Sequence, residues 1–116
     1  MSPDTARLIK TVALVDELLH SGRYSDLEQL CRRRRLSADQ IKNAVEDYPE
    51  ELAVRPDYQP EDLSVVHVTA SVPAKWSVCL DLWRRDGGRS DLTAMLTLID
   101  SDSDLYEVEI DDIHVL

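Results

Sequence analysis

The chain has 116 residues, of which 31% are charged and 43% hydrophobic, and it carries a net charge of −10. This length allows one modest hydrophobic core, while the negative charge disfavours direct binding to nucleic acid or to an anionic membrane. There is no run of about 18 apolar residues for a membrane span, and no signal peptide is visible. We therefore expect a single cytoplasmic domain over residues 1–116, with Cys31 and Cys79 as free thiols.

The first helix is predicted to begin at Ser2, which can cap it, with Pro3 in the first helical position. Apolar side chains then recur at helical spacing, and Gly22 is placed to end the helix. These core candidates are Leu8, Val12, Val15 and Leu19. One amphipathic helix is therefore expected over the first 22 residues.

Two capping boxes predict two further helices before residue 52. Ser25 with Glu28 would open the second helix, and Ser37 with Gln40 would open the third. The run Arg32–Arg35 between them is interpreted as a solvated helix end, where cations suit the helix dipole. The side chains expected to be buried or to share the apolar face are Leu27, Leu30, Cys31, Ile41, Ala44, Val45 and Tyr48.

From residue 64 onward, apolar and polar side chains alternate, which is typical of antiparallel strands with one face on a core. Asp86-Gly87-Gly88 suits a hairpin turn between two of these strands. That turn would pair Leu80 with Ala94 and Leu82 with Leu92, so that apolar side chains meet across the strands.

The last strand is predicted to start at Tyr106, and its alternation slips at Asp111-Asp112, which indicates a β-bulge. The predicted fold is α+β, with three N-terminal helices packed on a curved four-stranded antiparallel meander. The helical part spans 1–52 and the sheet part 63–116, and residues 49–62 are expected to form an extended connection over the surface. A nuclear-transport-factor-2-like (NTF2-like) cone has this layout.

Asp100, Asp102 and Asp104 stand at the spacing of the first ligands of a calcium loop. Such a loop also needs Gly at its sixth position and Glu at its twelfth, where this chain has Leu105 and Asp111. We therefore interpret this stretch as a polar hairpin turn. The histidines, His20, His67 and His114, have no second ligand nearby in sequence, so neither a metal site nor a cofactor is predicted.

Acidic side chains alternate outward on the predicted sheet and form the candidate site. If Leu98 lies opposite Tyr106, then Asp81 and Asp111 flank Thr93 at the sheet centre. Paired carboxylates can perform acid/base chemistry, but no nucleophile or phosphate-binding loop accompanies them, so an enzyme is not predicted. The interpretation is a surface for a basic protein partner. Its predicted contact residues are Asp81, Trp83, Asp100, Asp102, Asp104, Glu107, Glu109 and Asp111.

Three stretches in the C-terminal third resemble a small bacterial domain family that has no assigned catalytic residues. They are the strand that holds Trp76 and Trp83, the arm GRSDLT at 88–93, and the closing IDDIHVL at 110–116. The resemblance implies a bacterial cytosolic protein. In size, acidity and layout the chain is also similar to immunity proteins, which neutralise antibacterial toxins.

The leading hypothesis is therefore an immunity protein that binds and neutralises a cognate toxin with a basic active site. An alternative is a small-ligand-binding or enzymatic NTF2-like domain, with a pocket lined by Trp76, Tyr106 and Val108. In that pocket His67 or Tyr48 would supply the polar group. A third class is a dimerisation or adaptor module, in which the chain would form a homodimer.

Overall fold

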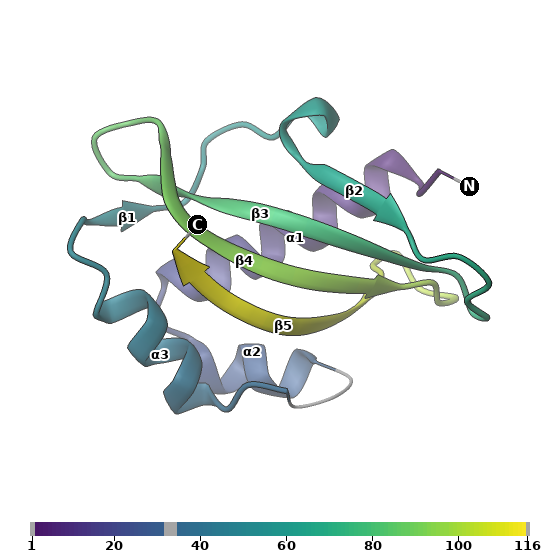
Figure 1. Ribbon diagram of the computed structural model, residues 1–116, viewed down its shortest axis with the longest axis horizontal. Coiled ribbons are helices and arrows are strands. Elements are labelled where there is room, and N and C mark those ends of the chain that lie inside the picture. Colours follow the sequence, from purple (N-terminus) through teal and green to yellow (C-terminus); the bar gives the residue numbers. More distant parts are fainter. Residues whose placement is uncertain (1, 32–34, 116) are drawn as a thin grey trace.

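Three helices precede five strands in the computed structural model, which describes residues 2–31 and 35–115 (Figure 1). The helices are α1 (Thr5–His20), α2 (Tyr24–Leu30) and α3 (Ala38–Glu46). The strands are β1 (Leu52–Ala53), β2 (Ser64–His67), β3 (Lys75–Arg84), β4 (Arg89–Ile99) and β5 (Glu107–Val115), and a short 3-10 helix, Pro60–Asp62, precedes β2. Among the described residues no helix is both long and apolar enough to cross a membrane.

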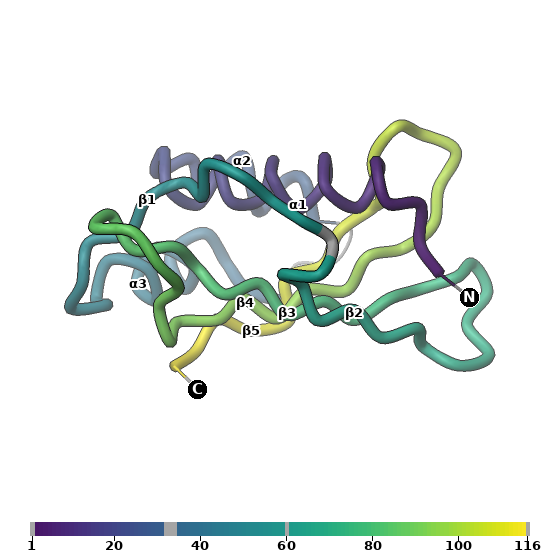
Figure 2. The backbone as a smooth tube through the Cα atoms, turned by 90° about the horizontal axis from the view of Figure 1, so that it is seen from above, coloured from purple at the N-terminus to yellow at the C-terminus, as the bar shows by residue number. Residues whose placement is uncertain are grey.

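The strands form one antiparallel sheet. β3, β4 and β5 pair in chain order, while β1 and β2 both pair with the other edge of β3. α1 and α2 cover one face of this sheet, and no described helix covers the opposite face (Figures 1 and 2). The predicted α+β fold is confirmed, and β1 adds a fifth strand within the stretch that was predicted to be an extended connection.

We call the uncovered side of the sheet the open face. Register pairs place neighbouring side chains on it, such as Ser77 with Thr97 and Cys79 with Met95. Its members include Val66, Ser77, Cys79, Asp81, Thr93, Met95, Thr97, Glu107, Glu109, Asp111, Asp112 and His114.

The start of α1 differs from the prediction. Asp4, not Ser2, caps the helix, because the Asp4 carboxylate accepts a hydrogen bond from the backbone N–H of Arg7. At the other end, Gly22 adopts a φ of +72°, and the N–H of Arg23 bonds to the carbonyl of Leu18. This is a Schellman termination, so the predicted role of Gly22 is confirmed.

Of the two predicted capping boxes, only one is present. Ser37 and Gln40 form the box that opens α3. The predicted box of Ser25 and Glu28 is wrong, because the turn at Gly22 places the first helical residue of α2 at position 24, so that Ser25 already lies inside the helix. Glu28 instead accepts a hydrogen bond from the backbone N–H of Ala38, which ties α2 to α3.

The core lies between the helices and the inner face of the sheet. The predicted apolar stripe of α1 is buried, and Leu27 of α2 and Ile41 of α3 join the same cluster. Leu30 is 37% exposed, so its predicted burial is wrong. The sheet contributes Trp76, Val78, Leu80, Leu82, Leu92, Ala94, Leu96, Leu98, Val108, Ile110 and Ile113.

The β3–β4 hairpin confirms part of the predicted register. Leu80 pairs with Ala94, but the register shifts after Asp81, and Trp83 pairs with Arg89. The predicted pair of Leu82 with Leu92 is therefore not formed. Gly87 and Gly88 both adopt positive φ values (+94° and +107°), as expected for glycines at this turn.

The register of β5 on β4 differs by two residues from the prediction, because Leu98 pairs with Val108. Tyr106 lies outside the strand, because its backbone N–H and its hydroxyl are both bonded to α1 and its N-terminal cap. Its N–H donates to Oγ1 of Thr11 at 3.0 Å, and its hydroxyl accepts from the N–H of Asp4 at 2.7 Å. The predicted bulge is confirmed at Asp111, between the pairs formed by Ile110 and Asp112.

Candidate functional site

Two carboxylates of the open face are held by threonine hydroxyls. Thr93 Oγ1 donates to Asp81 Oδ1 at 2.8 Å, and Thr97 Oγ1 donates to Asp111 Oδ2 at 2.7 Å. The predicted pairing of Asp81 with Thr93 is confirmed, but the predicted position of Asp111 beside Thr93 is wrong, because the β5 register differs by two residues and Asp111 bonds to Thr97 instead. Each side chain remains about one-third exposed (30% for Asp81 and 29% for Asp111). The acids are therefore two separate, oriented acceptors rather than a coupled catalytic pair.

Between these carboxylates, the open face has a small apolar centre. The sulfur atoms of Cys79 and Met95 lie 3.6 Å apart, and both side chains are half-buried. Asp112 pairs with Met95 in the ladder, its side chain is 59% exposed, and His114 Nδ1 lies 3.0 Å from its carboxylate. Both cysteines are free thiols, as predicted. Acids around an apolar centre are an arrangement suited to docking a basic protein surface.

Glu109 does not belong to the accessible part of this surface. It is 2% exposed, and Arg35 Nε lies 3.0 Å from its carboxylate and 3.2 Å from that of Asp111. Because it is buried, Glu109 is not available as the partner contact that was predicted, whereas Asp111, which shares Arg35, keeps 29% of its side chain exposed. Of the predicted basic run, Arg35 alone is described, and Arg32–Arg34 lie outside the described residues.

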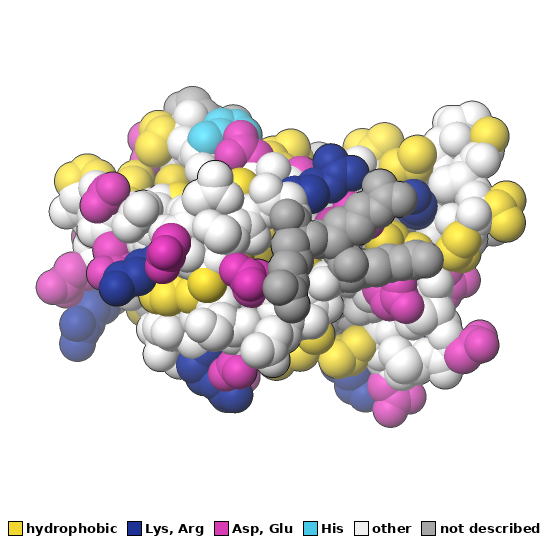
Figure 3. Space-filling model, turned by 90° about the horizontal axis from the view of Figure 1, so that it is seen from below, with side chains coloured by type: hydrophobic (Ala, Val, Ile, Leu, Met, Phe, Trp, Pro, Cys, Tyr) yellow, Lys and Arg dark blue, Asp and Glu magenta, His cyan; other side chains and the backbone are white. Residues whose placement is uncertain are grey.

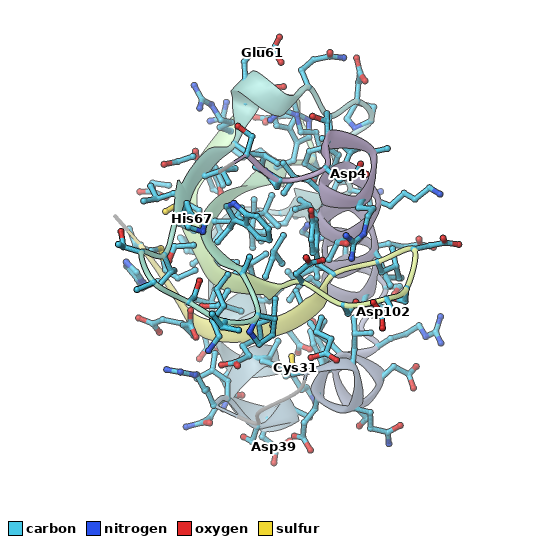
Figure 4. All side chains as sticks on the ribbon, turned by 90° about the vertical axis from the view of Figure 1, so that its right-hand side faces the viewer. Asp4, Cys31, Asp39, Glu61, His67 and Asp102 are labelled. Carbon is cyan, nitrogen blue, oxygen red and sulfur yellow. The ribbon has the colours of Figure 1, made fainter. Side chains whose placement is uncertain are left out.

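The hairpin between β4 and β5 lies on the helix side of the sheet, away from the open face. Arg7 of α1 binds it twice, with Nη1 at 3.0 Å from Asp100 and Nη2 at 2.8 Å from the carbonyl of Ser101. Asp102 lies beyond α1, on the opposite side from the open face (Figure 4). The prediction that Asp100, Asp102 and Asp104 extend the same acidic surface is therefore wrong. Glu107, at the start of β5, is exposed and lies on the same side of the strand as Glu109, so this predicted contact residue is on the open face.

On the face seen from below, acidic side chains do not form one continuous field (Figure 3). From below, acidic and basic groups are interspersed over the visible surface (Figure 3). Among the residues that the structure describes, no group of three His, Cys, Asp or Glu side chains is arranged to hold a metal ion.

Trp83, the predicted anchor, is half-buried and covered by a charged side chain. The Arg55 guanidinium lies 4.5 Å from the centre of its ring, which is a cation–π contact. Arg55 also forms an ion pair with Asp62 at 2.8 Å. Trp83 thus packs under the connection between β1 and β2, and a role as a freely exposed anchor is wrong.

A buried polar cluster on α1 is absent from the sequence prediction. Asp16 Oδ1 lies 2.9 Å from His20 Nε2, and Asp16 Oδ2 accepts from the Tyr58 hydroxyl at 2.5 Å and from the Arg55 N–H at 3.0 Å. Burial, followed by the charge of Asp16, raises the pKa of Tyr58 well above its usual range. The only sequence signal is an acid and a histidine at i and i+4 within an apolar helix face.

The ligand pocket predicted for an NTF2-like domain is filled by its own side chains. Trp76, Tyr106 and Val108 are at most 4% exposed, and the rings of Trp76 and Tyr106 lie 5.2 Å apart. The ring of His67 contacts Trp76 at 5.8 Å. A hollow of about 350 Å³ lies elsewhere, where the ends of α1 and α3 approach β1. It is lined by Leu19, His20, Tyr24, Val45, Glu46, Tyr48, Pro49, Glu50, Glu51, Leu52 and Arg85.

Comparison with known proteins gives one family. Residues 17–116 match the family model described as a domain of unknown function, DUF7668. Neither a curated protein nor a solved structure matches the chain.

Proposed function

The chain belongs to the DUF7668 family, a domain of unknown function, and we propose that it is an acidic module whose open face binds a basic protein. We further propose that this basic protein is an antibacterial toxin domain, and that the chain is the immunity protein that neutralises it. The protein is then an inhibitor, not an enzyme, and it needs no cofactor.

The observation that carries the proposal is the fixed orientation of Asp81 and Asp111. Thr93 and Thr97 orient them, and they stay about 30% exposed on the helix-free side of the sheet, with Arg89 at 3.6 Å from Asp81 and Arg35 at 3.2 Å from Asp111. A carboxylate that is already oriented loses less conformational entropy when it accepts a hydrogen bond from a partner's arginine or lysine. Such charge-assisted hydrogen bonds are among the stronger polar contacts at interfaces.

Charge distribution supports the same reading. Residues 56–116 contain thirteen acids and four bases, whereas residues 1–55 contain ten acids and nine bases. The sheet half therefore carries most of the net negative charge. Such a field accelerates encounter with a basic protein, and toxins that act on nucleic acid have basic active sites that suit this complement.

A growth-protection experiment tests the proposal. Where a neighbouring reading frame encodes a toxin domain, that domain is expressed in bacterial cells with and without this protein. We expect protection by the wild type, loss of protection with the double variant Asp81→Asn/Asp112→Asn, and full protection with Asp102→Asn/Asp104→Asn. The two variants remove the same charge, but the second removes it from the hairpin on the helix side of the sheet. Equal protection by both variants would exclude the open face as the binding surface.

A further inference from the structure

One stretch of this acidic chain contains no acid at all. Residues 63–80 form β2, the following loop and the first half of β3, and none is Asp or Glu, although the chain has 23 acids. The basic groups there are His67 and Lys75. Two copies of a chain with a net charge of −10 repel each other, and this is a surface at which they can meet without opposing carboxylates.

The same stretch exposes apolar side chains. Among the described residues, six large apolar side chains are exposed, and three of them lie here: Val66 (61%), Val68 (36%) and Val72 (94%). Exposed valines on or beside an edge strand favour pairing with another strand. Natural edge strands are usually protected by charge, and β2 has no acidic or lysine side chain in its Ser-Val-Val-His sequence.

The backbone of β2 has one side free. The N–H of Val68 bonds to the carbonyl of Lys75 at 2.9 Å, so the groups of Val66 and Ser64 point toward β3 as well. By alternation, the N–H and C=O groups of Val65 and His67 point away from β3. No other strand of the described chain pairs with that side, and β2 forms the upper border of the sheet (Figure 1).

We propose that a second copy of this chain binds the free side of β2, so that one antiparallel sheet continues across two molecules. A two-fold axis at Val66 places Val65 opposite His67 of the second copy. Each of these pairs exchanges two backbone hydrogen bonds, because both residues present their N–H and C=O groups outward. Val66 then lies opposite its own counterpart on the open face, at the closer, non-hydrogen-bonded spacing where side chains touch.

A second copy fits this edge better than the basic partner of the open face. The β2 edge has no carboxylate that could bind a cation of a basic partner. Its short apolar sequence can instead pair with the same sequence of a second copy across a two-fold axis, as an isologous interface requires. The proposal is independent of the function proposed above. The two also respond oppositely to salt: screening weakens binding of a basic partner but relieves repulsion between two acidic copies.

Sedimentation equilibrium of the purified chain, from micromolar to millimolar concentration, tests the proposal. The average mass should rise from 13.2 kDa toward twice that value, and should do so at lower concentration as salt is added. Val66→Lys should weaken self-association by at least about tenfold, because two lysines would then face each other. Val115→Lys is the control, since Val115 is a similarly exposed valine (54%) on β5.

Circular dichroism establishes that both variants are folded, which is expected because each substitution is at an exposed side chain. A wild type that stays monomeric throughout would overturn the proposal. So would a Val66→Lys chain that associates as tightly as the wild type. Loss of association in Val66→Lys with retention in Val115→Lys supports the β2 edge.

Discussion

The carboxylate of Asp16 and the imidazole of His20 lie 2.9 Å apart, one turn apart on α1, with 1% and 5% of their side chains exposed. The same carboxylate accepts from Tyr58 and from the backbone of Arg55. It therefore ties the central helix to the connection between β1 and β2. Arg55 in turn covers Trp83, so one buried acid organises both the connection and the neighbouring strand end.

We expect Asp16→Ala to lower the free energy of unfolding by about 3 kcal/mol or more, because it leaves buried donors without an acceptor. The matched control is Asp26→Ala. Asp26 forms an exposed ion pair with Arg23, and its loss should cost less than about 1 kcal/mol. Urea denaturation of both variants measures the difference. Similar values for the two would contradict the structural role assigned to Asp16.

Tyr58 should make stability fall at alkaline pH. Burial and Asp16 raise the pKa of Tyr58 above its usual value of 10, so the folded chain keeps a proton that the unfolded chain releases. The contribution of protonated Tyr58 to the free energy of unfolding is fully present below pH 10. It decreases above pH 10, by at most about 1.4 kcal/mol per pH unit. Thermal melting from pH 8 to pH 11 should show a smaller loss in Tyr58→Phe than in the wild type. Parallel curves would exclude this linkage.

The Cys31 thiol should react slowly in the folded chain. Burial raises its pKa, and nearby acids, led by Glu109, act in the same direction, although a backbone hydrogen bond from Ile110 opposes them. Since the thiolate is the nucleophile, fewer molecules are reactive at pH 8. In a Cys79→Ser background, alkylation by iodoacetamide should be several-fold slower than in urea. Equal rates in the two conditions would contradict the described burial.

The β5 register can be tested by double-mutant cycles. Asp111→Ala and Thr97→Val remove the two ends of one 2.7 Å hydrogen bond, so their effects on unfolding should be coupled by about 1 kcal/mol. The effects of Asp111→Ala and Thr93→Val on the free energy of unfolding should be additive to within about 0.5 kcal/mol. Coupling to Thr93 instead would restore the register that the sequence predicts.

Local patterns predict much of this fold and little of its site. The period of two, the bulge at Asp111 and the cap at Ser37 depend on neighbouring residues, and the structure confirms them. The register of β5 depends on Tyr106 binding α1, nearly one hundred residues away in sequence. No pattern within a single strand contains that information.

Partner atoms from distant segments also decide which acids are available. Glu109 alternates outward on β5, as predicted, but Cys31 bridges to Val108 on the same strand. Arg35 then reaches Glu109 and Asp111. Trp83 is similarly covered by Arg55 from another segment. Sequence alternation predicts the face that a side chain occupies, but not the cation that covers it.

The central claim, that the open face binds a basic protein, is tested most directly by the rate of association with a candidate toxin domain that has a basic surface. Stopped-flow mixing over a salt series should give a rate that falls as salt rises. At low salt, Asp81→Asn/Asp112→Asn should slow association about fivefold or more. The association rate of Asp102→Asn/Asp104→Asn should be closer to that of the wild type. A rate that neither salt nor the open-face variant changes would contradict the account.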